Sequence, residues 1–214
     1  METQGRRSVL VVGAGGHARV CIEALLDTDH EVVGVVSRDG AGVAGLPCPV
    51  VGRDVDLAEI ADRWGVRHVF VAIGDNRARE SVSAGCRAAG FVVVNAISRF
   101  AMVSPSACLG TGVAVLAGAV VNAAAVVGDG AILNTRCSVD HDARVEPFAH
   151  VAVGVSLGGG VVVGARALIG VGSSVLPMVS IGADAVVGAG AAVVRDVPPG
   201  VTVAGVPARP VAAS

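Results

Sequence analysis

The stretch that decides the fold is GVAVLAGAVVNAAAVVGDGAILN (residues 112–134), which belongs to a longer run with one repeated spacing. From Val103 to Val193 every sixth residue is Val, Leu or Ile, without interruption. The aliphatic positions are Val103, Leu109, Val115, Val121, Val127, Leu133, Val139, Val145, Val151, Leu157, Val163, Ile169, Val175, Ile181, Val187 and Val193. A fixed period indicates a repeat architecture, because a flexible low-complexity tract would not keep its register over such a length.

Two further positions of the hexad have a preferred residue type. A small or β-branched residue such as Ala119 or Cys137 lies two residues before each aliphatic, and Gly often follows the aliphatic directly. These glycines are Gly110, Gly128, Gly158, Gly164, Gly170, Gly182 and Gly188. The pattern predicts a parallel β-helix of triangular section, with one face per hexad. We expect the aliphatic side chains to fill the corners of the prism and the glycines to permit the turns.

The first part of the chain has a different organisation, in which short apolar runs alternate with amphipathic stretches. Strands are expected within 8–16, 31–37, 68–74 and 91–97, and helices within 17–26, 54–65 and 75–90. Nearly continuous apolar strands that alternate with helices predict a parallel α/β sheet covered on both faces. We therefore expect an α/β domain at residues 1–97 and an all-β domain at 98–214.

Composition and charge exclude several classes of protein. Hydrophobic residues make up 53% of the chain but aromatic residues only 2%, the net charge is −2, and no basic run is present, so a nucleic-acid groove is disfavoured. The uncharged residues 100–128 contain too many Gly, Ser and Pro residues for a membrane span, and the N-terminal apolar run is too short for a signal peptide. We expect a cytoplasmic protein. The five cysteines never form a CxxC pair, which predicts free, buried thiols and no zinc site.

The glycines that follow the first expected strand point to phosphate binding. Gly13, Gly15 and Gly16 come after an apolar strand and open a helix, where backbone N–H groups face an anion. As GxGxxA over residues 13–18, the motif also fits a dinucleotide, but that interpretation requires a carboxylate at the end of the second strand. Ser37 occupies that position instead, which weakens the NAD hypothesis.

The segment Asp140-His141-Asp142 interrupts a phase of the repeat that elsewhere holds mostly small residues. A carboxylate next to an imidazole fixes its tautomer and raises its basicity, so His141 is a candidate general base. Cys137 lies four residues away and would suit a Cys/His nucleophile, but the hexad requires a small residue there, and we disfavour that alternative. His30 and His68 stand at expected strand starts and are interpreted as ordinary histidines.

Five sequence motifs carry a family resemblance that covers nearly the whole chain. They are RDVPPG (195–200), AGVPAR (204–209), VVGAGGHA (11–18), FVAIGDNR (70–77) and ILNTRCSVDHD (132–142). The hexads together with the first two motifs resemble the hexapeptide-repeat acyltransferases. All five together look like the bacterial nucleotide-sugar acetyltransferases, which join a Rossmann-like domain to a left-handed β-helix and include UDP-4-amino-sugar and GDP-perosamine N-acetyltransferases.

The resemblance implies a homotrimer that transfers acetyl from acetyl-CoA to the amine of a nucleotide-linked sugar, without a metal. By resemblance, His141 is the general base and Asp142 orients it. By resemblance, the nucleotide-sugar site comprises His17, Gly74, Asp75, Asn76 and Arg77, next to the phosphate-binding Gly13, Gly15 and Gly16. Asn134, one hexad before Asp140, is a candidate substrate contact, with a stacked turn amide as the alternative. The implied acetyl-CoA contacts are His150, Gly159, Gly170 and Arg195.

Three other functions remain open on the sequence. The same fold acetylates sugar hydroxyls in relatives similar to sialic acid O-acetyltransferase. A nicotinamide-dependent oxidoreductase would use residues 11–18, but the hexads and AGVPAR argue against it. A β-helix without activity is the third alternative, and the charged residues 140–142 argue against it.

Overall fold

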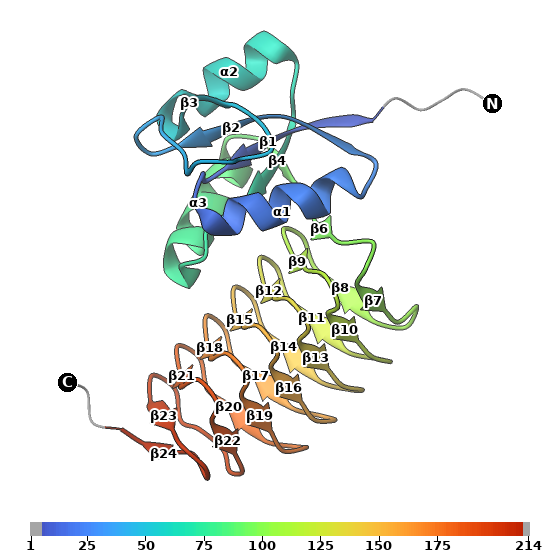
Figure 1. Ribbon diagram of the computed structural model, residues 1–214, viewed down its shortest axis with the longest axis vertical. Helices are drawn as coiled ribbons and strands as arrows, with labels where there is room; N and C mark the ends of the chain where they lie inside the picture. Colours follow the sequence, from blue (N-terminus) through green and yellow to red (C-terminus); the bar gives the residue numbers. More distant parts are fainter. Residues whose placement is uncertain (1–5, 212–214) are drawn as a thin grey trace. The chain divides into compact units, whose positions relative to one another are not determined.

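The computed structural model describes residues 6–211, and the chain divides between Arg99 and Phe100 into two compact units. The first unit contains β1 (Arg7–Val12), α1 (Gly16–Leu26), β2 (His30–Ser37), β3 (Val50–Arg53), the 3-10 helix η1 (Asp54–Asp56), α2 (Leu57–Trp64), β4 (His68–Val71), α3 (Asn76–Ala88), β5 (Val92–Val93) and β6 (Ala96–Ile97). All strands from β1 to β5 are parallel, in the order β3-β2-β1-β4-β5. Figure 1 labels the first four of them. This order is that of a doubly wound α/β sheet.

The central strand β1 is buried on both sides, which explains its unbroken apolar sequence. Leu10 and Val12 pack with buried residues of α2 and α3, among them Ile60 and Cys86. The alternation of side chains along a strand turns Val9 and Val11 to the opposite face. The sequence predicted these layers, but it missed the short edge strand β3 and treated β5 and β6 as one strand.

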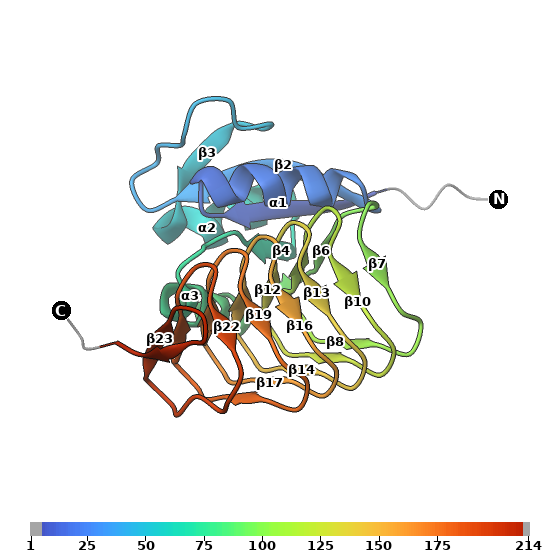
Figure 2. The ribbon, with the colours of Figure 1, turned by 60° about the horizontal axis from the view of Figure 1, so that its bottom comes forward.

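The second unit is a parallel β-helix made of two-residue strands, seen as stacked coils in Figure 2. They are β7 (Met102–Val103), β8 (Cys108–Leu109), β9 (Ala114–Val115), β10 (Val120–Val121), β11 (Val126–Val127), β12 (Ile132–Leu133), β13 (Ser138–Val139), β14 (Arg144–Val145), β15 (His150–Val151), β16 (Ser156–Leu157), β17 (Val162–Val163), β18 (Leu168–Ile169), β19 (Ser174–Val175), β20 (Ser180–Ile181), β21 (Val186–Val187) and β22 (Ala192–Val193). The longer strand β23 (Thr202–Ala204) extends one face, and β24 (Arg209–Pro210) pairs with it antiparallel.

From β7 to β22, strands of the β-helix that lie three places apart in the chain pair with each other, so the strands form three faces. One face runs β22-β19-β16-β13-β10-β7, a second runs β20-β17-β14-β11-β8, and the third contains β23-β21-β18-β15-β12-β9. The repeated aliphatic is the second residue of each strand, and from Val115 to Val193 all of these side chains are buried. The period of six therefore predicted both the faces and the core.

The turns differ from the sequence expectation in one respect. The left-handed residue comes three positions after each aliphatic, from Gly112 (φ 71°) to Gly190 (φ 67°), and includes Asp142 (φ 60°). The glycines that directly follow the aliphatics do not have a left-handed φ. They are required because coils approach closely: a Cβ at Gly164 would lie 2.4 Å from the backbone nitrogen of Ala183.

The cysteine expectation holds only in part, because Cys21, Cys86 and Cys137 are buried, whereas Cys108 is exposed and Cys48 is half-buried. Within residues 6–211, no helix is long and apolar enough to cross a membrane.

The first prediction compares one substitution at two leucines of the β-helix. Leu133 is fully buried, whereas Leu176 is 52% exposed. Leu133→Ala removes buried methyl groups and leaves a cavity, so we expect it to lower the free energy of unfolding by about 2–5 kcal/mol. Leu176→Ala should change it by less than about 1 kcal/mol. Chemical denaturation of both variants measures the difference, and equal losses would contradict the assignment of the core.

Candidate active site

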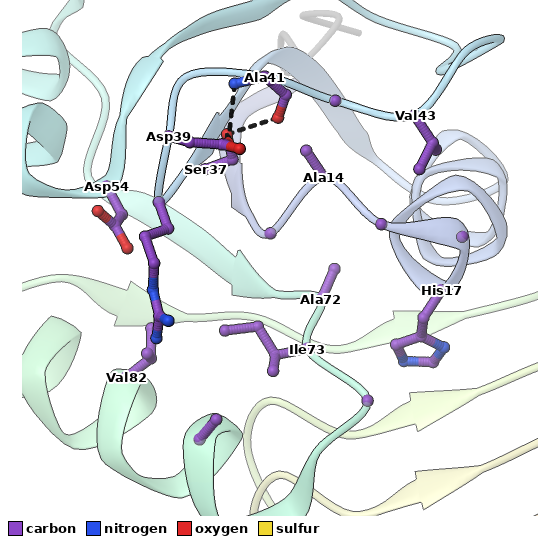
Figure 3. Close-up of a pocket in the computed structure, with 17 residues that line it drawn as sticks. Ala14, His17, Ser37, Asp39, Ala41, Val43, Asp54, Ala72, Ile73 and Val82 are labelled. Atoms are coloured by element: carbon purple, nitrogen blue, oxygen red, sulfur yellow. Dashed lines mark hydrogen bonds between the residues drawn. The ribbon is translucent and has the colours of Figure 1, made fainter.

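The first unit contains a cavity of about 740 Å³ at the carboxyl ends of β1, β2 and β4 (Figure 3). Three loops line it: residues 13–17 after β1, residues 37–43 after β2 and residues 72–74 after β4. The carboxyl ends of parallel strands are the usual position for a ligand in an α/β sheet. Five of the expected nucleotide-site residues therefore line one cavity, namely Gly13, Gly15, Gly16, His17 and Gly74.

The loop after β1 is suited to an anion. Gly13 has φ 109°, and a Cβ there would lie 2.8 Å from the carbonyl oxygen of Ala72, so only glycine allows the two loops to meet. Helix α1 begins at Gly16 after Gly15, and no side chain caps its N-terminus. Since Cβ positions at both glycines face open space, the first N–H groups of the helix are accessible to a phosphate.

The loop after β2 contains a carboxylate, that of Asp39, near the strand end at which Ser37 stands. Ser37 is buried and its hydroxyl donates to the carbonyl oxygen of Ala41 (2.6 Å) and to Oδ1 of Asp39 (3.2 Å). The N–H of Ala41 donates to the same Oδ1 (3.0 Å) and, as the largest contribution, lowers the pKa of Asp39. A dinucleotide-binding motif requires the carboxylate at the strand end, whereas the structure puts a charged one two residues later, in the lining of the cavity.

A buried cationic side chain organises the loop after β4. The guanidinium of Arg79, which is 1% exposed, donates to the carbonyl oxygens of Ile73 (2.9 Å) and Gly74 (3.0 Å) and to Oδ1 of Asn76 (2.8 Å). Burial lowers its pKa to about 10. Sequence reasoning missed Arg79, because nothing in a helical pattern distinguishes a buried arginine from a solvated one.

His17 lies close to the same cation. Its Nε2 is 3.3 Å from Sγ of Cys21, and burial followed by the charge of Arg79 lowers its pKa to about 4. Burial also raises the pKa of the Cys21 thiol to about 12. At neutral pH the cavity therefore presents an uncharged imidazole.

Four of the expected nucleotide-site residues do not line this cavity: Asn134, which belongs to the β-helix, and three residues at the start of α3. Asp75 is the N-cap of α3 and accepts the N–H of Ala78 through Oδ1 (2.8 Å). Asn76 binds Arg79, and Arg77 follows in the first turn of the helix. Asp75 and Asn76 thus organise the loop that carries Gly74.

The second unit holds His141 and Asp142 on the turn that follows β13. Nδ1 of His141 is 2.8 Å from Oδ2 of Asp142, and the histidine side chain is 62% exposed. The hydrogen bond to Asp142 and then the charge of Asp140 raise the pKa of His141. A carboxylate can accept a hydrogen bond only from a nitrogen that carries a proton. In the neutral ring, Nδ1 therefore carries the proton and Nε2 has the free lone pair.

Asp140 supports this turn, a role that was not visible in the sequence. Its Oδ1 accepts the N–H of His141 (2.8 Å) and Nδ2 of Asn122 (2.9 Å), which lies 18 residues earlier on the neighbouring coil. These bonds lower the pKa of Asp140, so it remains charged beside the histidine. Asn122 precedes Asp140 by 18 residues, which is one coil, and this spacing could have identified it in the sequence as a partner of Asp140.

The remaining expected site residues lie elsewhere on the β-helix. Asn134 and His150 contact each other, with Nδ2 and Nε2 3.1 Å apart. Gly159 lies one coil after His141, directly against its ring. Gly170 approaches the next coil, where a Cβ would lie 2.5 Å from the carbonyl oxygen of Val187. Arg195 lines a small cavity together with residues near the end of the described chain.

The structure argues against a cysteine nucleophile. Cys137 is fully buried, and burial raises the pKa of its thiol to about 12, so it is protonated at neutral pH and out of reach of a substrate. Among the described residues, no group of three or more His, Cys, Asp or Glu side chains is arranged to hold a metal ion.

Comparisons with known proteins show relatives that match nearly the whole chain. Residues 8–85 match the PglD N-terminal domain. A mutant GDP-perosamine N-acetyltransferase from Caulobacter crescentus, with a histidine replaced by alanine and in complex with CoA and GDP-perosamine, is 47% identical over 96% of this chain and 97% of that chain, with a TM-score of 0.92. The acetyltransferase domain of PglB from Neisseria gonorrhoeae, in complex with acetyl coenzyme A, is 37% identical over 97% of this chain and 100% of that chain, with a TM-score of 0.88.

A curated relative adds only local similarity. The uncharacterized protein L142 of Acanthamoeba polyphaga mimivirus is 32% identical over 105 residues, which are 49% of this chain. The matched region spans only about a fifth of that protein, 20% of its length.

A Rossmann-like domain followed by a left-handed hexapeptide-repeat β-helix defines a class of acyltransferases, as the sequence predicted. Within that class, the chain belongs to the hexapeptide-repeat nucleotide-sugar N-acetyltransferase family.

The second prediction concerns the stability of the α/β unit in acid. The pKa of His17 is about 4 in the folded protein, below the ordinary 6.5, so the unfolded state binds the proton more readily. The free energy of unfolding should therefore fall as the pH drops from 6.5 to 4, by up to about 3 kcal/mol. Denaturant titrations at several pH values should show a smaller fall in His17→Gln. Identical pH dependence in both proteins would contradict the lowered pKa.

The third prediction concerns the titration of His141 itself. Its raised pKa depends first on the hydrogen bond to Asp142, so Asp142→Asn should move the pKa of His141 down towards 6.5. Asparagine also tolerates the left-handed conformation of this turn, so the fold should be kept. NMR titration of the imidazole measures the shift. An unchanged pKa in the variant would show that Asp142 does not control the ring.

Proposed function

We propose that this enzyme transfers acetyl from acetyl-CoA to the amine of a nucleotide-linked amino sugar, with His141 as general base. The observation that carries the proposal is the 2.8 Å contact between Nδ1 of His141 and Asp142, on an exposed turn of the β-helix. This contact leaves Nε2 available as a base and raises the pKa of the imidazole.

The chemistry requires one proton acceptor and one proton donor. The amine nitrogen attacks the thioester carbonyl while Nε2 of His141 removes its proton, and collapse of the intermediate breaks the C–S bond. The imidazolium then returns the proton to the CoA thiolate, which restores the base. Asp142 stabilises the imidazolium in between, and the charge of Asp140 acts in the same direction.

We assign the cavity of the α/β unit to the nucleotide part of the substrate. Accessible N–H groups at Gly15 and Gly16 suit the diphosphate, and Asp39 offers a charged acceptor for a sugar hydroxyl. Binding of NAD is the competing use of such a loop, but the similarity to a nucleotide-sugar enzyme covers 96% of this chain. Asn134, His150, Gly170 and Arg195 keep the substrate and acetyl-CoA roles that the sequence suggested, as proposals.

An amine acceptor is favoured over a hydroxyl acceptor. A relative 47% identical to this chain is an N-acetyltransferase crystallised with CoA and GDP-perosamine. GDP-perosamine is therefore the first candidate in a panel of GDP-, UDP- and dTDP-linked amino sugars supplied with acetyl-CoA. A product whose acetyl group resists hydroxylamine is an amide, whereas loss of the group indicates an ester.

We further propose that the enzyme works as a homotrimer in the cytoplasm. Exposed apolar side chains repeat one coil apart on the β-helix, as at Val153 and Val171, or at Leu176 and Val194. A cyclic assembly would bury such columns. The cytoplasm is proposed because it is where acetyl-CoA and nucleotide-activated sugars are available.

The fourth prediction tests the base. His141→Ala should lower kcat by about 10²–10⁴-fold and leave KM for both substrates nearly unchanged, because the imidazole accepts a proton in the transition state and does not contribute to substrate binding. Steady-state kinetics with His68→Ala as a histidine control measures this. Turnover near the unmodified rate in His141→Ala would overturn the proposal, and loss of acetyl-CoA binding would make His141 a ligand contact.

A further inference from the structure

The imidazole of His141 lies against the backbone of Gly159, one coil further along the β-helix. A Cβ at Gly159 would lie 2.7 Å from both Cε1 and Nε2 of His141 and 3.3 Å from Nδ1. The N–H of Gly160 donates to the carbonyl oxygen of His141 (2.9 Å), so the two turns are held together. The ring therefore fills the space that any side chain at position 159 would occupy.

The repeat itself does not require glycine at this position. Gly159 is the second residue after the aliphatic Leu157, and the same phase holds Ala at 117, 123, 165, 183 and 189 and Val at 153 and 171. Between residues 105 and 195 it is the only glycine at this phase. Its φ also lies outside the left-handed region, unlike that of Gly160 (φ 66°). Neither the repeat nor the backbone conformation explains the glycine at position 159, whereas its contact with the ring of His141 does.

We propose that Gly159 is a positioning residue for His141, whose missing side chain lets the imidazole lie where Nδ1 meets Asp142. The inference rests on the proposed function, because it matters for catalysis only if His141 is the base. It differs from the acetyl-CoA contact that the family resemblance implies for Gly159.

An added methyl group at Gly159 would displace the ring more readily than the backbone. The backbone is fixed on both sides, since Gly159 also accepts the N–H of Met178 through its carbonyl (2.9 Å). The ring, in contrast, is 62% exposed and is held by the hydrogen bond to Asp142. We expect Gly159→Ala to fold, to break that bond and to misplace the base.

The test combines Gly159→Ala, His141→Ala and the double variant with a matched control. The control is Gly52→Ala, where a Cβ would lie 2.6 Å from Cδ1 of Ile60, a similar crowding against a side chain that does not involve His141. In Gly159→Ala, we expect the NMR-measured pKa of His141 to fall towards 6.5 and kcat to fall about 10–10²-fold, with both KM values kept. Adding Gly159→Ala to His141→Ala should lower kcat no further.

Each other outcome has a definite meaning. An unchanged pKa of His141 in Gly159→Ala, an equal loss of kcat in both backgrounds, or a raised KM for acetyl-CoA alone would overturn the inference. If Gly159→Ala failed to fold but the double variant folded, the result would support a clash with the ring of His141. If neither folded, glycine would be required by the backbone and the inference would be overturned. Normal turnover in His141→Ala would instead overturn the proposed function.

Discussion

Backbone pairing between successive coils, without any slip in register, is the interaction on which the rest of the β-helix depends. The N–H of Val120 donates to the carbonyl of Cys137 (2.9 Å), and the N–H of Ser138 donates to that of Val155 (2.8 Å). Neighbouring strands therefore lie about 4.8 Å apart. Residues 18 positions apart become contacts at this spacing, as in Asn122 with Asp140 or Arg166 with Asp184. The bond from Asn122 to Asp140, beside His141, is a product of that stacking.

The α/β unit builds its cavity by a different principle. Its three loops meet because parallel strands end at the same edge of the sheet, and their fine geometry depends on buried polar groups. Arg79 is the main one, since a guanidinium without water must find acceptors nearby, and the carbonyl oxygens of Ile73 and Gly74 provide them. A loop held in this way is ordered before any ligand arrives, which lowers the entropic cost of binding.

Periodicity predicted the fold well, because it reports burial. The sixfold pattern predicted the three faces and the core, and the Asp140-His141-Asp142 segment was visible since it broke that pattern. Contacts between side chains were not visible in the same way. The bond between Asn134 and His150, the burial of Arg79 and the role of Asp39 depend on where loops and turns place single atoms. The glycines that follow the aliphatics were misinterpreted because close approach between coils and a left-handed turn favour the same residue.

The three-sided coil also limits how this protein can change in length. Removing three hexads, one full coil of 18 residues, would return every later side chain to its own face, and the column above it would be rebuilt from similar residues. Removing a single hexad keeps the core, because an aliphatic still follows each small residue, but it rotates everything downstream by one face. Such a deletion between residues 141 and 159 would stack His141 on residue 165 in place of residue 159, whereas a deletion between residues 122 and 140 would separate Asp140 from Asn122. Insertions and deletions that are neutral for folding thus fall into two classes by their effect on the site, and only whole coils outside residues 122–159 preserve both the fold and the contacts of His141.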